Sequence, residues 1–167
     1  MYRLLTDKEV NQYYGRLRAG SYEEACTYIQ YLNVGISKKK VFYWGICLQG
    51  EEKIAGTVCL WNMRKEQSII ELGYELLPEC QRKGIMQEAL PVVIDFAFNT
   101  LHYKKVEAWP SADNLRSIHL LVKYHFRRDR EAEANIDWSK EAQFYRENEE
   151  NRKIETTIYS LHKNSEV

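Results

Sequence analysis

The spacing of the hydrophobic positions changes along the chain, and each change predicts a different kind of element. Among the first forty residues, apolar positions at helical spacing predict helices over Glu9–Arg18 and after Ser21. Ser21 followed by Glu24 fits a capping box, which marks a helix start. Further on, β-rich runs separated by short polar turns predict three antiparallel strands. These strands are expected at Val41–Leu48, Lys53–Met63 and Ser68–Leu77.

The second half of the chain alternates between helices and strands. An apolar stripe from Ile85 to Leu101 predicts a long helix, in which Pro91 is expected to cause a kink or loosen one turn. Three more elements are predicted: a strand Val106–Trp109, a helix Leu115–Tyr124 and a strand Glu155–Leu161. The order of these elements predicts an α+β (mixed α/β) fold and excludes a doubly wound parallel sheet.

Composition adds the size and the general class of the protein. A chain of 167 residues without repeats or a linker predicts a single domain over residues 1–167. Its 24 basic and 24 acidic side chains cancel, so we expect no general attraction to nucleic acid or to an anionic membrane. No apolar run approaches the roughly 20 residues of a membrane span. With no signal-peptide pattern either, a cytoplasmic location is expected. The cysteines and histidines show no metal-site spacing, so no metal is expected.

The loop before the long helix carries the candidate chemistry. It reads Leu76-Leu77-Pro78-Glu79-Cys80-Gln81-Arg82-Lys83-Gly84-Ile85-Met86. The first N–H groups of a helix have no partner inside the helix, and the helix dipole adds partial positive charge there. Gly84 lets the backbone approach phosphate oxygens, and Arg82 and Lys83 add charge at the rim. The loop can therefore bind a pyrophosphate, although the residues alone also fit a basic connector that merely starts a helix.

Two blocks of sequence resemble the GNAT superfamily of acetyltransferases. The stretch Glu71-Leu72-Gly73-Tyr74-Glu75-Leu76-Leu77-Pro78, followed by Gln81-x-x-Gly84-x-Met86, is similar to the acetyl-CoA motif of that family. The stretch Asn114-Leu115-Arg116-Ser117, followed by Lys123-Tyr124-His125-Phe126, is similar to its Asn-x-x-Ser segment, which usually ends in Gly-Phe. Met86 and His125 depart from the family pattern. The branch that the chain resembles contains the ribosomal-protein N-terminal (alanine/serine) acetyltransferases.

The resemblance covers roughly residues 9 to 162 and implies a central, mostly antiparallel sheet flanked by helices. In the family, a segment similar to residues 7–14 follows a first strand, yet almost nothing precedes it here. The first strand is therefore expected to be missing, shortened or supplied by another subunit. A monomer or a homodimer is compatible with this expectation.

The resemblance also implies acetyl-CoA as co-substrate and direct acetyl transfer to a primary amine, either a protein N-terminus or a small molecule. The implied cofactor-binding residues are Leu76, Leu77, Gln81, Arg82, Lys83, Gly84, Ile85, Met86, Asn114, Ser117 and Lys123. Backbone N–H groups near Leu76 and Leu77 would stabilise the thioester oxygen. Asn114 would contact the pantetheine arm, and the side chain of Met86 is expected to face the pyrophosphate region.

Three residues are candidates for the proton transfers. The resemblance places Glu71 where many family members carry the carboxylate that removes a proton from the amine. Glu75 is the alternative, because two residues four apart on a regular strand share a face. Ser117 matches a serine that lies near the cofactor sulfur, whereas the tyrosine acid of many members falls at Leu121 and is absent. From the residues alone, the carboxylates also fit a solvent-facing strand, and Ser117 fits a first-turn helix residue.

Two other interpretations remain open. Met86, Leu121 and the short N-terminus fit a non-catalytic CoA-binding homologue, and the phosphate-binding loop fits an unrelated nucleotide-binding module. The aromatic residues Trp138, Phe144 and Tyr145 either line an acceptor pocket or anchor their segment to the core. Nothing in the composition selects one acceptor.

Overall fold

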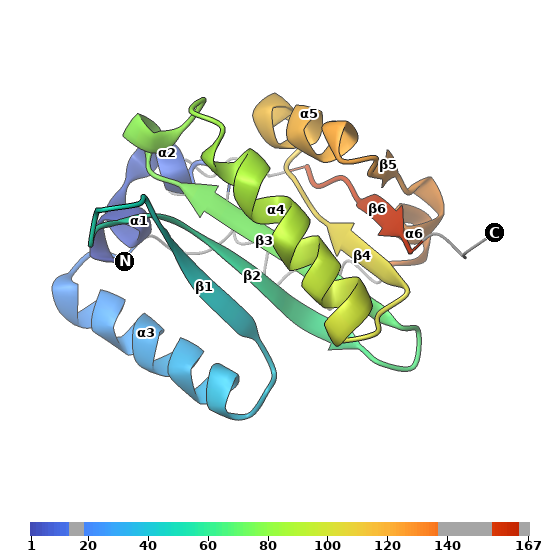
Figure 1. Cartoon of the computed structure of the whole chain (residues 1–167), viewed down its shortest axis with the longest axis horizontal. Coiled ribbons are helices and arrows are strands. Elements are labelled where there is room, and N and C mark those ends of the chain that lie inside the picture. The colour runs from blue at the N-terminus through green and yellow to red at the C-terminus, as the bar shows by residue number, and fades with distance from the viewer. Residues whose placement is uncertain (14–18, 137–154, 164–167) are drawn as a thin grey trace.

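The computed structural model describes residues 1–13, 19–136 and 155–163 (Figure 1). The helices are α1 (Tyr2–Thr6), α2 (Lys8–Asn11), α3 (Tyr22–Ser37), α4 (Ile85–Asp95), α5 (Leu115–Lys123) and α6 (Arg130–Asn135). A short 3-10 helix, η1 (Pro78–Cys80), precedes α4, and a π-helical turn, η2 (Phe96–Thr100), follows it. The strands are β1 (Phe42–Cys47), β2 (Ile54–Arg64), β3 (Ile69–Leu76), β4 (Lys105–Ala108), β5 (Arg127–Arg128) and β6 (Tyr159–His162).

The six strands form one sheet in the order β1-β2-β3-β4-β6-β5. Only β3 and β4 run parallel, and all other neighbours are antiparallel. Helices flank this sheet, so the predicted mixed α/β class with a mostly antiparallel sheet is confirmed (Figure 1). Within the described residues no strand precedes β1, which lies at one edge of the sheet.

The N-terminal helices differ from the predicted helix Glu9–Arg18. Only α2 overlaps it: this helix begins one residue before Glu9 and ends at Asn11. Asp7 separates α2 from α1, because it adopts an extended backbone and its carboxylate accepts a hydrogen bond from the Val10 amide at 2.9 Å. Residues 14–18 lie outside the described part of the chain. The capping box at Ser21 is confirmed, since its hydroxyl accepts the Glu24 amide at 3.2 Å and starts α3.

One face of the sheet carries the hydrophobic core, beneath α4 and α5 (Figure 1). Side chains from the middle strands pack there against both helices. Its fully or almost fully buried members include Val58, Leu60, Ile70, Leu72, Leu90, Val106, Leu121 and Phe126. This packing fixes the start of α4 and the start of α5 over the same side of the sheet.

Pro91 does not interrupt α4, which continues to Asp95. Proline has no N–H, so the carbonyl of Gln87, four residues earlier, loses its helical donor. The hydroxyl of Tyr124, just after α5, donates to this carbonyl at 2.6 Å and replaces the missing bond. The expected irregularity comes later, as the π-helical turn η2.

The end of α5 explains the histidine that departs from the family pattern. His125 has a φ of 64°, a left-handed conformation that glycine adopts most easily. Its amide bonds the Val122 carbonyl, and the Phe126 amide bonds the Leu121 carbonyl, each at 3.0 Å. These two bonds form a Schellman motif, so His125 occupies a position that glycine normally fills at a helix end.

Two short elements after α5 were not predicted. β5 pairs with β6, and α6 starts where the Asp129 carboxylate accepts the Ala132 amide at 2.9 Å. The predicted last strand, Glu155–Leu161, is shorter in the structure and spans Tyr159–His162, preceded by an isolated bridge between Ser111 and Thr156. The other predicted strands and helices lie within a few residues of their observed bounds, except that α4 ends at Asp95 and the stripe continues through η2.

Candidate active site

The site begins where two parallel strands separate. β3 and β4 pair at three positions only, and the last pair joins Glu71 to Glu107. β3 then continues to Leu76 beside β2, whereas the chain leaves β4 at Ala108 and turns toward α5 (Figure 1). The divergence opens the sheet in a wedge, with Glu71 at its apex.

A cleft of about 1000 Å³ fills this wedge and reaches both faces of the sheet. On the core face its walls are the loop before α4, the first turn of α4 and one side of α5. On the opposite face its walls are β1 to β3 and α3. The residues on this second face include Tyr28, Tyr31, Tyr43, Thr57, Cys59, Trp61, Glu71, Gly73 and Glu75.

The start of α4 forms one wall of the cleft, and its backbone favours an anion. Gly84 precedes the helix with a φ of 81°, and no side chain of the described residues caps it. The first intrahelical bond of α4 that reaches back to Gly84 comes from the Glu88 amide, at 3.1 Å. The amides of Ile85, Met86 and Gln87 therefore have no acceptor inside the helix, and the helix dipole favours an anion in front of them. A Cβ added to Gly84 would meet nothing within 4 Å, so the space there is open.

The loop residues predicted to bind the cofactor divide into two groups. Six of them line the cleft: Leu76, Gln81, Arg82, Gly84, Ile85 and Met86. Lys83 and Leu77 are absent from its walls. Lys83 is exposed between Arg82 and Gly84, which both line the cleft, so its charge lies at the rim.

The prediction that Leu77 helps to stabilise the thioester oxygen is wrong. Its side chain packs against Leu4 and Val10, and its amide donates to the Ala55 carbonyl at 2.9 Å. Because backbone N–H groups alternate in direction along a strand, the Leu76 amide points away from β2 and toward the wedge. The backbone amide of Leu76, and not that of Leu77, is therefore the one that can face a thioester oxygen in the wedge.

The expectation for Met86 is also corrected. Its side chain is only 6% exposed and belongs to the core beneath α4, so it does not project over the open space in front of Gly84. Met86 borders the cleft from below and contributes a backbone amide to the helix start.

The side chain of Gln81 braces the cleft. Its Nε2 donates to the Leu76 carbonyl at 3.2 Å, and its Oε1 accepts a hydrogen bond from Arg116 Nη1 of α5 at 2.7 Å. Arg116 also pairs with Glu9 of α2 at 3.2 Å. The sequence did not single out Arg116, because this contact joins segments 35 residues apart.

The predicted residues of α5 meet at the cleft as well. Asn114 Oδ1 accepts the Ser117 amide at 3.1 Å, which caps α5 and leaves the Asn114 NH₂ group as the one that can reach a cofactor. Lys123 Nζ donates to Gln87 Oε1 of α4 at 2.5 Å. Leu121 is fully buried in the core.

Glu71 and Glu75 lie on the face opposite the core. Their register against β2 is regular from Leu76 back to Glu71, so the two carboxylates share a face as predicted. They are only 5% and 7% exposed, which rules out the alternative of a solvent-facing strand. Glu71 Oε2 accepts a hydrogen bond from Asn62 Nδ2 at 3.1 Å.

Glu75 ends a short chain of hydroxyl groups. Thr57 Oγ1 donates to Glu75 Oε1 at 3.0 Å, and the Tyr43 hydroxyl donates to Thr57 Oγ1 at 3.1 Å. Burial, together with the nearby Glu75 carboxylate, raises the pKa of Tyr43 above its ordinary value, so this phenol stays protonated. The hydrogen bonds from Tyr43 through Thr57 thus fix the Glu75 carboxylate. Glu71 lies at the apex of the wedge, where β3 and β4 part.

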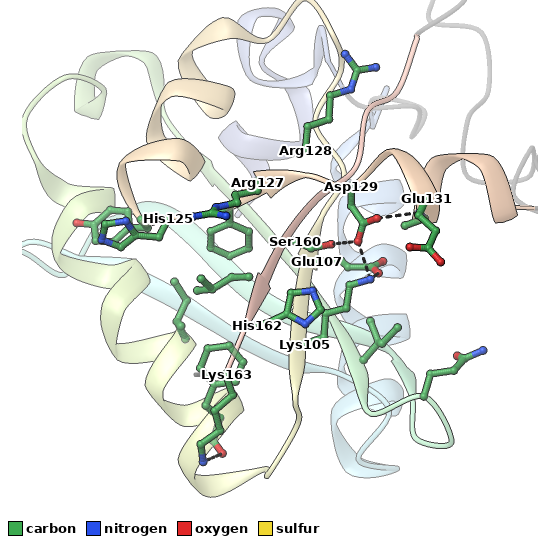
Figure 2. Close-up of a pocket in the computed structure, with 18 of the residues that line it drawn as sticks. Lys105, Glu107, His125, Arg127, Arg128, Asp129, Glu131, Ser160, His162 and Lys163 are labelled. Carbon is green, nitrogen blue, oxygen red and sulfur yellow. Dashed lines mark hydrogen bonds and ion pairs between the residues drawn. The ribbon is translucent and has the colours of Figure 1, made fainter. Parts of the chain in front are cut away.

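A second hollow, of about 1670 Å³, lies along β4, β5 and β6 (Figure 2). Three of its charged side chains, Lys105, Glu107 and Asp129, point toward one another (Figure 2). Lys105 Nζ lies 2.9 Å from Glu107 Oε1 and 2.7 Å from Asp129 Oδ2. Arg64 pairs with the same Glu107. This hollow is larger than the cleft, but several of its charges are already paired within it, and it does not include the start of α4. Its network instead anchors β4 beside Glu71.

Among residues 1–13, 19–136 and 155–163, no group of three or more histidine, cysteine, aspartate or glutamate side chains could hold a metal ion. In the same ranges no helix has the length and apolar character to cross a membrane. Trp138, Phe144 and Tyr145, the possible acceptor-pocket aromatics, lie outside the described part of the chain.

Comparisons with known proteins place the chain in one group. A family model described as "Acetyltransferase (GNAT) domain" matches residues 1–127. The uncharacterized N-acetyltransferase YoaA of Bacillus subtilis is 28% identical over 129 residues, which cover 77% of this chain and 73% of that protein.

Solved structures of low sequence identity share the fold. The ribosomal-protein-S5-alanine acetyltransferase from Vibrio fischeri has a TM-score of 0.75 at 20% identity, covering 98% of this chain and 86% of its own. The spermidine N-acetyltransferase from Vibrio cholerae, in complex with CoA and spermine, has a TM-score of 0.74 at 16% identity, covering 96% and 86%.

Proposed function

Because the chain belongs to the acetyltransferase (GNAT) domain family, we propose that it moves the acetyl group of acetyl-CoA directly to a primary amine. The family membership confirms the predicted class of enzyme, an N-acetyltransferase. The acceptor, the binding residues and the catalytic residues belong to the proposal.

The observation that carries the proposal is a cleft that reaches both faces of the sheet. It joins the uncapped start of α4 on one face to the buried Glu71 on the other. The diphosphate of CoA fits the start of α4, because three backbone amides, the helix dipole and Arg82 favour an anion there. The pantetheine arm would then pass between β3 and α5, where Asn114 offers its NH₂ group.

Each chemical demand of the transfer has a residue in this cleft. Glu71 takes a proton from the protonated amine, directly or through a water molecule, and leaves a neutral nitrogen. That nitrogen attacks the thioester carbonyl, whose oxygen gains negative charge opposite the Leu76 amide. The C–S bond then breaks with its electron pair on sulfur, and Ser117 is the hydroxyl that can hydrogen-bond the leaving thiolate.

The acceptor is a protein N-terminus or a small amine in this proposal. The two structural neighbours described above are named for one substrate of each kind, a ribosomal protein and spermidine. We expect the reaction in the cytoplasm, without a metal ion. A non-catalytic CoA-binding homologue is the alternative. Met86 was one argument for it, and that argument weakens because the Met86 side chain lies in the core.

The test measures thiol release from acetyl-CoA with a panel of peptides and polyamines, and CoA affinity by calorimetry. Glu71→Gln should lower kcat by about 10² or more and leave CoA affinity nearly unchanged. Glu75→Gln is the matched control, because Glu75 is equally buried on the same face of β3.

The outcomes separate the alternatives. A large loss in Glu75→Gln with none in Glu71→Gln would assign the base to Glu75. CoA binding without turnover on any amine would support the non-catalytic alternative. A chain that binds ATP but no CoA would contradict the proposal and favour a nucleotide-binding module.

A further inference from the structure

Two hydroxyl groups of the cleft, those of Tyr74 and Ser117, meet between β3 and α5. Tyr74 lies on β3 between Glu71 and Glu75, but the alternation of a strand directs its side chain to the opposite face of the sheet. Its hydroxyl crosses to α5 and lies 2.7 Å from Ser117 Oγ. Both residues line the cleft.

We propose that Tyr74 is a positioning residue that holds the Ser117 hydroxyl so that its hydrogen points at the sulfur leaving acetyl-CoA. The inference rests on the proposed function, because it concerns a step of the same transfer. It assigns a role to a residue on the core side of β3, away from the carboxylates.

The direction of the hydrogen bond follows from the chemistry of the two groups. A phenol is far more acidic than an aliphatic hydroxyl and is the stronger donor. The Ser117 carbonyl also lies near the phenol, but its distance of 3.4 Å is long for an O–H···O bond. The phenol therefore donates to Ser117 Oγ, and the hydrogen of the serine is directed elsewhere.

The backbone of Ser117 is held independently. Its amide donates to Asn114 Oδ1 at 3.1 Å, so the main chain of Ser117 is tied by the cap of α5 and its side chain by Tyr74. A serine in the first turn of a helix otherwise tends to satisfy nearby backbone groups. The bond from the phenol competes with that tendency and keeps Oγ at the cleft.

Tyr74 itself is unsuited to give up its proton. Burial raises the pKa of this phenol above its ordinary value, an effect that the bond to Ser117 offsets only in part. A thiolate, whose acid has a pKa of about 8.5, would therefore not remove that proton. The phenol acts as a fixed donor and not as an acid.

The reaction balances without a proton from tyrosine. The ammonium nitrogen loses two protons, one before it attacks and one after the C–N bond forms. One proton leaves to solvent through Glu71, and the other neutralises the thiolate once the C–S bond has broken. The hydrogen bond from Ser117 lowers the energy of the thiolate before that proton arrives.

The test uses Tyr74→Phe, which keeps the ring in the core and removes only the hydroxyl group. We expect kcat to fall about tenfold, the loss of one hydrogen bond in the transition state, with the KM for acetyl-CoA nearly unchanged. Ser117→Ala should lower kcat at least as much. The double variant should be no slower than Ser117→Ala, because Tyr74 acts through the serine.

Tyr124→Phe is the matched control. It also removes a phenol hydroxyl at α5, but this hydroxyl bonds the Gln87 carbonyl and Tyr124 is not a lining residue of the cleft. Its kcat should stay unchanged. A drop in kcat there as large as in Tyr74→Phe would show a general effect on α5 and would overturn the inference.

The remaining outcomes distinguish the inference from the proposed function. Unchanged kcat in Tyr74→Phe, or losses that multiply in the double variant, would reject the inference alone. Absence of turnover in the unmodified chain with every amine would reject the proposed function and the inference with it.

Discussion

Replacing Gly84 by glutamate should weaken CoA binding, whereas the same replacement at Gly50 should leave it unchanged. The two glycines form a matched pair, with φ values of 81° and 82°, and a Cβ at either would meet nothing within 4 Å. Gly50 lies in the turn between β1 and β2, and it does not line the cleft. Both substitutions therefore place an L-residue in a left-handed conformation, at a cost of about 1 to 2 kcal/mol in folding free energy.

The expected difference in binding follows from Coulomb's law. A carboxylate about 6 Å from a phosphate charge repels it by roughly 0.7 kcal/mol at the dielectric constant of water and by about 2.8 kcal/mol at an effective value near 20. These energies correspond to a roughly three- to hundredfold loss of affinity. The new carboxylate can also occupy the amides at the start of α4, which would add to the loss.

Calorimetry with CoA, at low and high salt, measures this difference. The loss in Gly84→Glu should shrink as salt is added, because the repulsion is partly screened. An acetyl-pantetheine thioester, which lacks the diphosphate, should bind Gly84→Glu and Gly50→Glu alike. Equal CoA affinity in the two variants, or an equal loss with the pantetheine ligand, would show that the phosphates bind elsewhere.

Two further predictions concern the supports of the site. Tyr124→Phe should lower the free energy of unfolding by about 1 to 2 kcal/mol in a urea titration, because the Gln87 carbonyl would then lack both its helical donor and its substitute. In a Pro91→Ala background, Tyr124→Phe should lower the free energy of unfolding by less, because the amide that alanine brings to this position can donate to the Gln87 carbonyl. An equal loss in both backgrounds would show that the Tyr124 hydroxyl does not replace the missing helical donor. Burial works against ionisation of Asp129, but hydrogen bonds from Lys105, a backbone amide and a serine hydroxyl lower its pKa from 3.8 to about 2. A carboxyl whose pKa falls on folding stabilises the protein above its unfolded pKa, so about 2 kcal/mol should be lost as the pH falls from about 4 to about 2. Urea titrations of the unmodified chain and of Asp129→Asn should converge over that interval, and a constant difference would contradict the assignment.

The local parts of the fold were predictable from the sequence. The β-rich run Ser68–Leu77 predicted a strand on which Glu71 and Glu75 share a face if it is regular, and the structure shows this regular register. The pair Ser21 and Glu24 predicted the start of α3. Each of these features depends on hydrogen bonds or side-chain directions within a few residues of the chain.

The N-terminal helix shows where local reasoning failed. The predicted helix Glu9–Arg18 began one residue after the observed start of α2 and continued past Asn11, where α2 ends. The observed start is set by Asp7, whose carboxylate accepts the Val10 amide. The capping signal was present in the sequence, because aspartate is a common N-cap residue. The prediction followed the helical spacing of the apolar residues over Glu9–Arg18 and did not use this capping signal.

Within the candidate site, the loop was predicted more successfully than its individual side chains. The positions of Leu77 and Met86 were misjudged, because a sequence motif does not say which side chains the core takes up. Leu77 packs on the N-terminal helices and Met86 packs beneath α4. The contacts of Gln81 with Arg116 and of Tyr74 with Ser117 span 35 and 43 residues, beyond any periodic signal.

The sequence by itself determined the strands, the helix caps and the glycine at the start of α4, since these depend on bonds between near neighbours in the chain. Only the tertiary structure decided that β3 and β4 part after Glu71, and that α5 lies close enough for Ser117 to meet Tyr74. The reason is that strand pairing and helix packing join distant segments, and their geometry depends on how the whole core fills its volume. The cleft results from that packing, although the helices and strands that form its walls depend on local sequence.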